Sequence, residues 1–275
     1  MPNSNKIKIV LSVFLLLVAI LAGVGLTALS KKNSVSMRYN HAFIIGINNY
    51  EHWPKLESPV KDAEAVAKIL LDKYDFKKEN IVLLTDKTAK QPTEATILDY
   101  LDGYIEKLTK NDNLLIFFSG HSTEDDDGET YWIPKDGRKR LRYWLSHTEL
   151  SESYFSAKDF KAKSLLVLAD SHVNSNLIKS TPISLSPYDL RYPEKIKEKA
   201  SRKSREIIAF GDQHWPGSPE TKGRGLFAHY LVKALEDNFL GIIDFENLMF
   251  DENIIFPISK IAGTKLQRGR LVTPT

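Results

Sequence analysis

The sequence predicts an α/β domain, built on a mostly parallel central sheet flanked by helices, that follows one N-terminal transmembrane helix. Two patterns predict this architecture. From His41 onward, short apolar runs alternate with segments whose apolar residues recur every three or four positions, which is typical of strands and helices in alternation. Before them, the stretch from Ile9 to Leu29 carries no charged residue.

The uncharged stretch is long enough to span a membrane. At about 1.5 Å per residue, a helix over residues 9–29 crosses a hydrocarbon core of roughly 30 Å, and it exceeds the roughly 7–15 apolar residues of a cleavable signal peptide. We therefore expect a single-pass membrane protein, with a cleaved signal peptide as the competing interpretation. Basic residues on both sides of the stretch leave its orientation undetermined. Residues 1–8 are then a short N-terminal tail, and residues 30–40 link the helix to a domain at 41–275.

Charge and cysteine content limit the chemistry of the domain. The net charge of +3 is too small to indicate a nucleic-acid partner. The chain has no cysteine, which excludes disulfides, thiolate metal sites and a thiol nucleophile. We expect no cofactor and no resident metal, and the sequence leaves the oligomeric state open.

Five apolar runs are predicted as strands of one sheet. Each is short and almost uncharged, as expected for a strand that is covered on both faces. They are expected at residues 42–47, 81–85, 114–118, 165–169 and 206–211. Because sites in such sheets form beyond the carboxyl ends of the strands, the residues that follow these runs are the candidates for function.

Three helices are predicted between the strands. The first begins at Ser58 as N-cap with Pro59 at its first position, and Asp62 and Lys68 are expected off its apolar face. The second begins at Thr93. The apolar stripes consist of Ala63, Ala67, Leu70 and Leu71 in the first helix, Ile97, Leu101, Tyr104 and Leu108 in the second, and Phe227, Tyr230, Leu231, Ala234 and Leu235 in the third.

Two polar segments interrupt the alternation, and we interpret both as solvated surface. Residues 124–129, EDDDGE, are predicted as an acidic turn that leads a short hairpin. Its alternative role is to receive a basic ligand or a cation at Asp125, Asp126 and Asp127. Residues 174–205 are predicted as a long loop that ends in a basic run. The alternative expectation is that another peptidase, specific for basic residues, cleaves this loop.

Chemistry-bearing side chains follow two of the predicted strands. The third strand ends in FFSGHS, which places His121 after Gly120, and the fourth ends in LADSH, which contains Ser171. If the two strands are neighbours, both side chains lie at one sheet edge, where a nucleophile beside a histidine base suits covalent acyl transfer. The backbone N–H groups of Ser171 and Ser122 are candidate donors to an oxyanion.

A metal site is the other chemistry that these strand ends allow. Asp170 and His172 alternate on an extended segment and could join His121 around an ion. An ordinary α/β-hydrolase is not indicated, because no Gly-x-Ser-x-Gly elbow surrounds Ser171.

The order of the motifs resembles the caspase and metacaspase-like cysteine peptidases. The blocks that carry the resemblance are HAFIIGINNY, LESPVKDAEAVAKIL, IVLLTDKTA, NDNLLIFFSGHS, DGETYWIPKDG, LLVLADSH and GRGLFAHYLVKAL, within residues 40–236. The resemblance implies a caspase-hemoglobinase fold and a His–Cys dyad that cleaves peptide bonds. The family's Ser-Gly-His-Gly motif matches at His121, and its cysteine position matches at Ser171. The separation of about 50 residues between them agrees with the spacing in caspases.

The departures from the family fall on the catalytic positions. The cysteine is replaced by Ser171, and the glycine after the histidine by Ser122. The family's aspartate two positions before the nucleophile, which shapes a pocket for a basic residue, falls on Ala169. A shift of one residue would place Asp170 at this acidic position and His172 at the nucleophile position.

These substitutions predict a membrane-anchored caspase-like domain that is catalytically inactive and acts in protein or peptide binding or in regulation. A serine hydroxyl is much less acidic than a thiol, and it needs an aligned base and a competent oxyanion hole. The alternative function is an active serine-type hydrolase that uses a His121–Ser171 dyad.

Overall fold

The computed structural model describes residues 39–171, 178–179, 202–210, 218–238, 243 and 266–271. The chain divides into two units, residues 1–37 and 38–275, and all described residues belong to the second. The predicted membrane helix at 9–29, His172 and most of the 174–205 loop lie outside the described residues. Among the residues that are described, no helix is long and apolar enough to cross a membrane.

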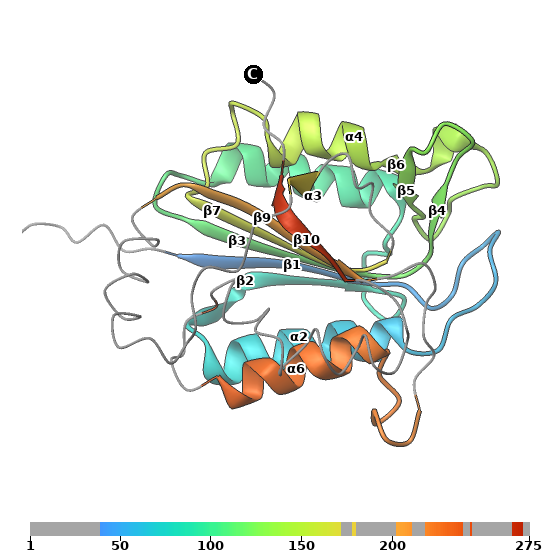
Figure 1. Ribbon diagram of the computed structural model, residues 1–275, viewed down its shortest axis with the longest axis horizontal. Helices are drawn as coiled ribbons and strands as arrows, with labels where there is room; N and C mark the ends of the chain where they lie inside the picture. The colour runs from blue at the N-terminus through green and yellow to red at the C-terminus, as the bar shows by residue number, and fades with distance from the viewer. Residues whose placement is uncertain are drawn as a thin grey trace, which may run out of the picture. The chain divides into compact units, whose positions relative to one another are not determined.

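A seven-stranded sheet forms the centre of the domain, in the order β2-β1-β3-β7-β9-β10-β8 (Figure 1). The first five of these strands run parallel: β2 (Phe76–Thr85), β1 (Asn40–Gly46), β3 (Asn113–Ser119), β7 (Ser164–Asp170) and β9 (Ser204–Phe210). Strand β10 (Leu266–Leu271) is antiparallel to both β9 and β8 (Ile178–Lys179). The predicted α/β fold with a mostly parallel sheet is confirmed.

Helices cover both faces of the sheet. Helices α2 (Pro59–Lys73) and α6 (Leu226–Asp237) lie side by side on one face, and α3 (Glu94–Lys107) and α4 (His147–Leu150) lie on the other (Figure 1). Helix α2 has Pro59 at its start as predicted, and the side chain of Thr93 caps α3 by accepting the N–H of Thr96.

Side chains alternate between two cores because successive residues of a strand point to opposite faces. Phe117 and Leu168 pack against α2 and α6, whereas Ile116 and Val167 pack on the face of α3. Burial on both faces explains why these strands are continuous apolar runs. The alternation also sends Ala169 into the α3 core and Asp170 to the face of α2 and α6.

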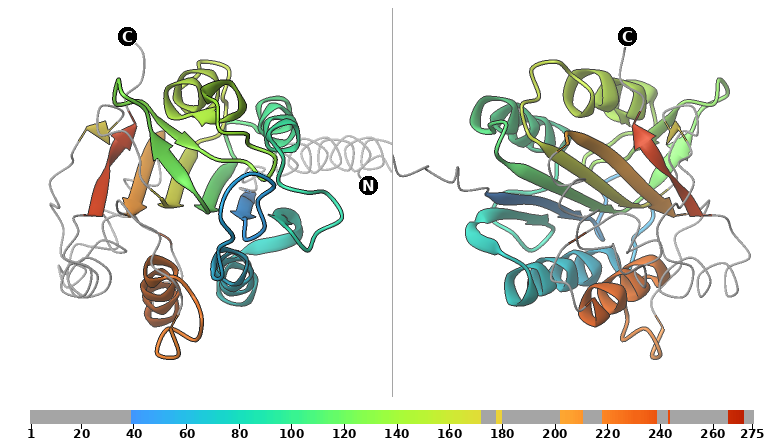
Figure 2. Two further views of the ribbon diagram at one scale, coloured as in Figure 1. Left: turned by 90° about the vertical axis from the view of Figure 1, so that its right-hand side faces the viewer. Right: turned by 60° about the vertical axis from the view of Figure 1, so that its left-hand side comes forward.

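A small antiparallel sheet stands beyond the carboxyl ends of the parallel strands (Figure 2). It consists of β4 (Ser122–Glu124), β5 (Thr130–Trp132) and β6 (Leu145–Ser146). The acidic turn joins β4 to β5, so the predicted hairpin is confirmed. Asp125 holds the turn by accepting the N–H groups of Asp127 and Glu129, and Gly128 has a φ of 80°, which favours glycine.

Candidate functional site

The ends of β3 and β7 meet at one edge of the sheet. The two strands are parallel neighbours with Ser119 opposite Asp170, so His121 and Ser171 follow adjacent strands as expected. Gly120 is required between strand and histidine, because a Cβ there would overlap the hydroxyl of Tyr50 and approach the Phe118 ring to 3.1 Å.

The His121 ring is held by the segment that follows β1. Its Nε2 lies 2.8 Å from the carbonyl oxygen of Pro54, and its backbone N–H donates to the Tyr50 hydroxyl at 2.7 Å. Since a carbonyl oxygen only accepts hydrogen bonds, Nε2 carries the proton, and Nδ1 is the basic nitrogen of the neutral ring. The rings of Tyr50 and Trp53 lie 4.7 and 5.7 Å away between centroids. Burial lowers the pKa of His121, which favours the neutral form.

Ser171 is buried and engaged elsewhere. Only 6% of the residue is exposed, and its Oγ accepts a hydrogen bond of 3.0 Å from the indole Nε1 of Trp132. Trp132 is fixed by stacking on Phe118, with 4.4 Å between ring centroids. Within the described part of the chain, no hydrogen bond joins Ser171 to His121. The nucleophile–base contact of a catalytic dyad is therefore not formed in this geometry.

Two buried carboxyl groups lie beside this pair, and we call Asp62 and Asp170 the carboxyl pair. Their exposed fractions are 0% and 3%. Asp62 accepts hydrogen bonds from the Ser119 hydroxyl at 3.2 Å and from the Gly225 N–H at 2.8 Å. A Cβ on Gly225 would lie 2.8 Å from Asp170 Oδ2 and 3.0 Å from Asp62 Oδ2, so the carboxyl groups converge beneath this glycine. In the described structure Asp170 Oδ2 has no hydrogen-bond partner.

The surroundings of the carboxyl pair raise the pKa of both aspartates above the ordinary value for this side chain. Burial raises the pKa of Asp62 to about 7, and burial together with the charge of Asp62 raises the pKa of Asp170. Two converging carboxylates in a low-dielectric site repel one another, so the pair retains a proton near neutral pH.

The position of Asp62 corrects the sequence-based expectation. We expected it off the apolar face of its helix, but it is fully buried at the start of α2. Its spacing of four and eight residues from the buried Val66 and Leu70 was the available signal, because such positions share one helix face. Tyr50, Trp53 and Trp132 were also missed, since aromatic residues in loops and short strands carry no distinctive spacing.

Two further predictions concern the oxyanion candidate Ser122 and the alternative metal site. Ser122 is the first residue of β4 and pairs with Trp132 across the small sheet. Among the described residues, no group of three potential metal-ligating side chains comes together. The alternative metal site of His121, Asp170 and His172 stays a prediction, since His172 lies outside the described residues.

Sequence comparison gives a family match that begins at the first residue of β1. The family model of the metacaspase, peptidase C14 domain matches residues 40–141. Metacaspase-1 of Eremothecium gossypii is 32% identical over 107 residues, which cover 37% of this chain and 23% of that protein. Metacaspase-1 of Schizosaccharomyces pombe is 31% identical over 111 residues, covering 38% and 25%. The aligned part thus spans about a quarter of the length of these curated relatives.

Structural comparison extends over more of the chain. The crystal structure of protein GSU0716 from Geobacter sulfurreducens superposes with a TM-score of 0.56 and 19% identity, covering 86% of this chain and 95% of that chain. At this identity the likeness concerns the fold.

The described fold is an α/β fold with a mostly parallel sheet, and its first part is similar to the metacaspase, peptidase C14 domain. The expected caspase/metacaspase resemblance is confirmed over residues 40–141, which include His121 and end before Ser171.

Proposed function

We propose that this protein is a membrane-anchored domain of the caspase-hemoglobinase type that binds a protein or peptide without cleaving it and acts in regulation. One observation carries the proposal: in a chain without cysteine, the Ser171 hydroxyl is hydrogen-bonded to Trp132 and not to His121. A hydroxyl that accepts a hydrogen bond from an indole and contacts no base is not activated as a nucleophile.

The orientation of Asp170 supports the same proposal. Asp170 faces Asp62 and Ser119, whereas Ala169 packs in the opposite core. This orientation favours the alignment shifted by one residue, in which Asp170 takes the family's acidic position. In that alignment the nucleophile position falls on His172, which carries neither a thiol nor a hydroxyl group.

A fluorophosphonate probe tests the absence of serine-hydrolase activity. The full chain, purified in an uncharged detergent, is incubated with the probe beside its Ser171→Ala variant. We expect no labelling of either protein and no cleavage of a peptide library, since the hydroxyl lacks a base. Labelling of the wild type that is lost in Ser171→Ala would establish the alternative, a serine-type hydrolase.

Two cysteine variants distinguish the alignments. A thiol at the family's nucleophile position, near His121, is expected to have a lowered pKa and to be alkylated rapidly by iodoacetamide at neutral pH. We expect this behaviour for His172→Cys and not for Ser171→Cys, because Ser171 is buried beneath Trp132. The reverse order of alkylation rates would restore Ser171 as the nucleophile position.

A further inference from the structure

A strongly basic segment lies beside the candidate site, between β5 and β6. Residues 138–142 read RKRLR, and all five are exposed. We call the cations Arg138, Lys139, Arg140 and Arg142 the basic rim. In the described part of the chain, none of them forms an ion pair; the ion pairs there involve other side chains. The rim is thus available to an external anion.

Aromatic rings hold the basic rim in place. The guanidinium groups of Arg138 and Arg142 lie 5.4 and 4.7 Å from the centre of the Tyr143 ring, and Arg142 also donates to the Tyr143 hydroxyl at 2.7 Å. The ammonium group of Lys139 lies 5.9 Å from the centre of the Trp53 ring. Stacked cations are partly ordered before a ligand arrives, so they lose less conformational entropy on binding.

The rim is continuous with the candidate site through these rings. Trp53 packs on His121, and its centroid lies 5.6 Å from that of Trp144, which in turn contacts Tyr131 at 5.6 Å. In addition, Trp53 Nε1 is buried without a hydrogen-bond partner in the described structure. An extended ligand that crosses the ends of the parallel strands would therefore reach the rim.

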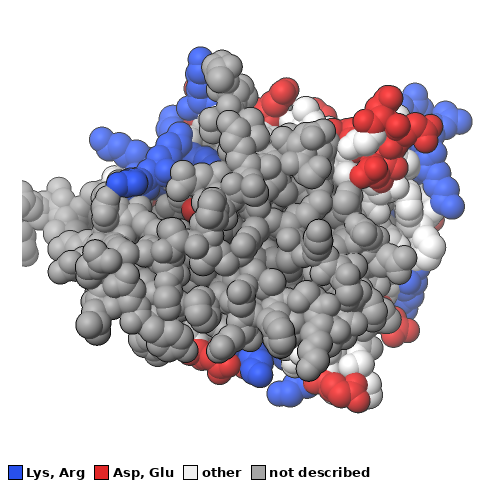
Figure 3. Space-filling model, viewed as in Figure 1, with Lys and Arg blue, Asp and Glu red and all other residues white. Residues whose placement is uncertain are grey.

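The acidic turn lies beside the rim, and in the described part of the chain no ion pair joins the two. Figure 3 shows the Lys and Arg side chains gathered next to Asp and Glu side chains over β4 to β6. Asp125 is occupied by the Tyr131 hydroxyl and by backbone N–H groups, and Glu129 accepts from Ser146 and Thr148. The two exposed aspartates of the turn, Asp126 and Asp127, form no ion pair with the rim.

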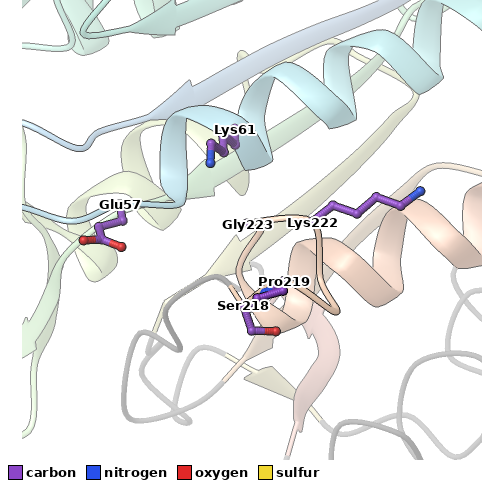
Figure 4. Close-up of a pocket in the computed structure, with 6 residues that line it drawn as sticks. All are labelled: Glu57, Lys61, Ser218, Pro219, Lys222 and Gly223. Atoms are coloured by element: carbon purple, nitrogen blue, oxygen red, sulfur yellow. The ribbon is translucent and has the colours of Figure 1, made fainter.

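Two further cations border the strand ends on the side of α2 and α6. An open cavity of about 290 Å³ is lined by Lys61 and Lys222, together with Glu57, Ser218, Pro219 and Gly223 (Figure 4). The carboxyl pair, which could have received a basic side chain, is buried. Lys61 and Lys222 therefore add positive charge beside the strand ends.

We propose that this face binds an acidic peptide segment of a partner protein, with its carboxylates on the basic rim and its backbone over Trp53 and His121. The inference rests on the proposed function and specifies that the bound peptide is negatively charged. Arginine forks match carboxylates in bidentate geometry, and the exposed Leu141, at 48%, offers an apolar contact beside them.

Fluorescence anisotropy with three matched peptides tests the proposal. The full chain in uncharged detergent is titrated with a labelled glutamate-rich peptide, its glutamine twin and its lysine twin. We expect the glutamate peptide to bind about tenfold more tightly than the glutamine twin and to lose this advantage as salt is raised. Arg138→Glu with Arg142→Glu should weaken its binding about tenfold or more.

The matched control carries the same change of net charge elsewhere. Lys77→Glu with Lys78→Glu alters two exposed lysines at the opposite end of the sheet, and it should leave affinity within about twofold. Arg140→Glu, at an exposed position, is the gentler variant should the double substitution impair folding.

Three outcomes would overturn the inference. Equal binding of the glutamate and glutamine peptides would do so and leave the proposed function standing, as would equal losses in the rim and control variants. Binding of phosphatidylserine micelles but of no peptide would assign the rim to a membrane surface instead. Cleavage of a bound peptide, detected by mass spectrometry, would overturn the proposed function itself.

Discussion

Trp132 decides what the hydroxyl of Ser171 can do. The Trp132 indole N–H donates a hydrogen bond to Ser171 Oγ, and the indole ring stacks on the Phe118 ring. Ser171 itself is buried. On the other side of the strand ends, His121 directs its protonated nitrogen at Pro54. Each potential catalytic group thus has a structural partner of its own, which explains at the level of single atoms why the two are not joined.

The carboxyl pair makes stability depend on pH in a predictable direction. The pKa of Asp62 is raised from 3.8 to about 7 in the folded state, and that of Asp170 is raised as well, so the folded protein binds more protons than the unfolded chain in this range. Stability is therefore highest at low pH with respect to these groups and falls as pH rises from about 4 to about 7. His121 acts in the opposite sense, because its pKa is lowered.

The substitution Asp170→Asn separates the pH dependence caused by the carboxyl pair from that caused by His121. The substitution keeps the shape of the side chain but removes a titrating group and its repulsion from Asp62. We expect the melting temperature of the variant to fall less than that of the wild type between about pH 4 and pH 7. Differential scanning calorimetry at several pH values measures the difference. Parallel pH profiles for the two proteins would show that the carboxyl pair does not titrate in this window.

At the level of elements, the parallel strands and the three main helices were predictable from the sequence. The buried strands are continuous apolar runs, and the helices have apolar residues at helical spacing. β10 was not predictable, since LQRGRL has no apolar run or clean alternation and is placed by pairing with β9. The strand-end positions of His121 and Ser171 could be predicted from order along the chain. Their hydrogen-bond partners, Pro54 and Trp132, could not, because both come from segments without periodicity.

Gly120 and Gly103 provide a matched pair for testing how tightly the end of β3 is packed. A Cβ at Gly120 would overlap the Tyr50 hydroxyl, so Gly120→Ala should lower the free energy of unfolding by about 1–3 kcal/mol. A Cβ at Gly103 in α3 meets nothing within 4 Å, and Gly103→Ala should raise stability by up to about 1 kcal/mol. Urea denaturation measures both. Equal effects would contradict the close approach of Tyr50 to the strand end.

At the level of the whole molecule, the sheet acts as a platform whose carboxyl edge gathers parts that are distant in sequence. The loop after β1 supplies Tyr50 and Trp53, the small sheet supplies Trp132, and the start of α6 supplies Gly225. Such an edge is the usual place of sites in parallel α/β folds. Here these parts pack around the strand ends, beside the exposed cations of the basic rim, where we propose that the acidic peptide binds.

The predicted membrane helix would keep that surface at a bilayer, and its sequence allows a direct test. Two arginines near the middle of an apolar span cost about 2.5–3.5 kcal/mol each, so Leu16→Arg with Ile20→Arg should prevent stable insertion. We expect the wild-type chain to remain in the membrane pellet after alkaline carbonate extraction and this variant to be released. Leu16→Ala with Ile20→Ala is the control and should stay with the pellet. If the wild-type chain is released, and its mature N-terminus lies beyond residue 29, the stretch is a cleaved signal peptide instead.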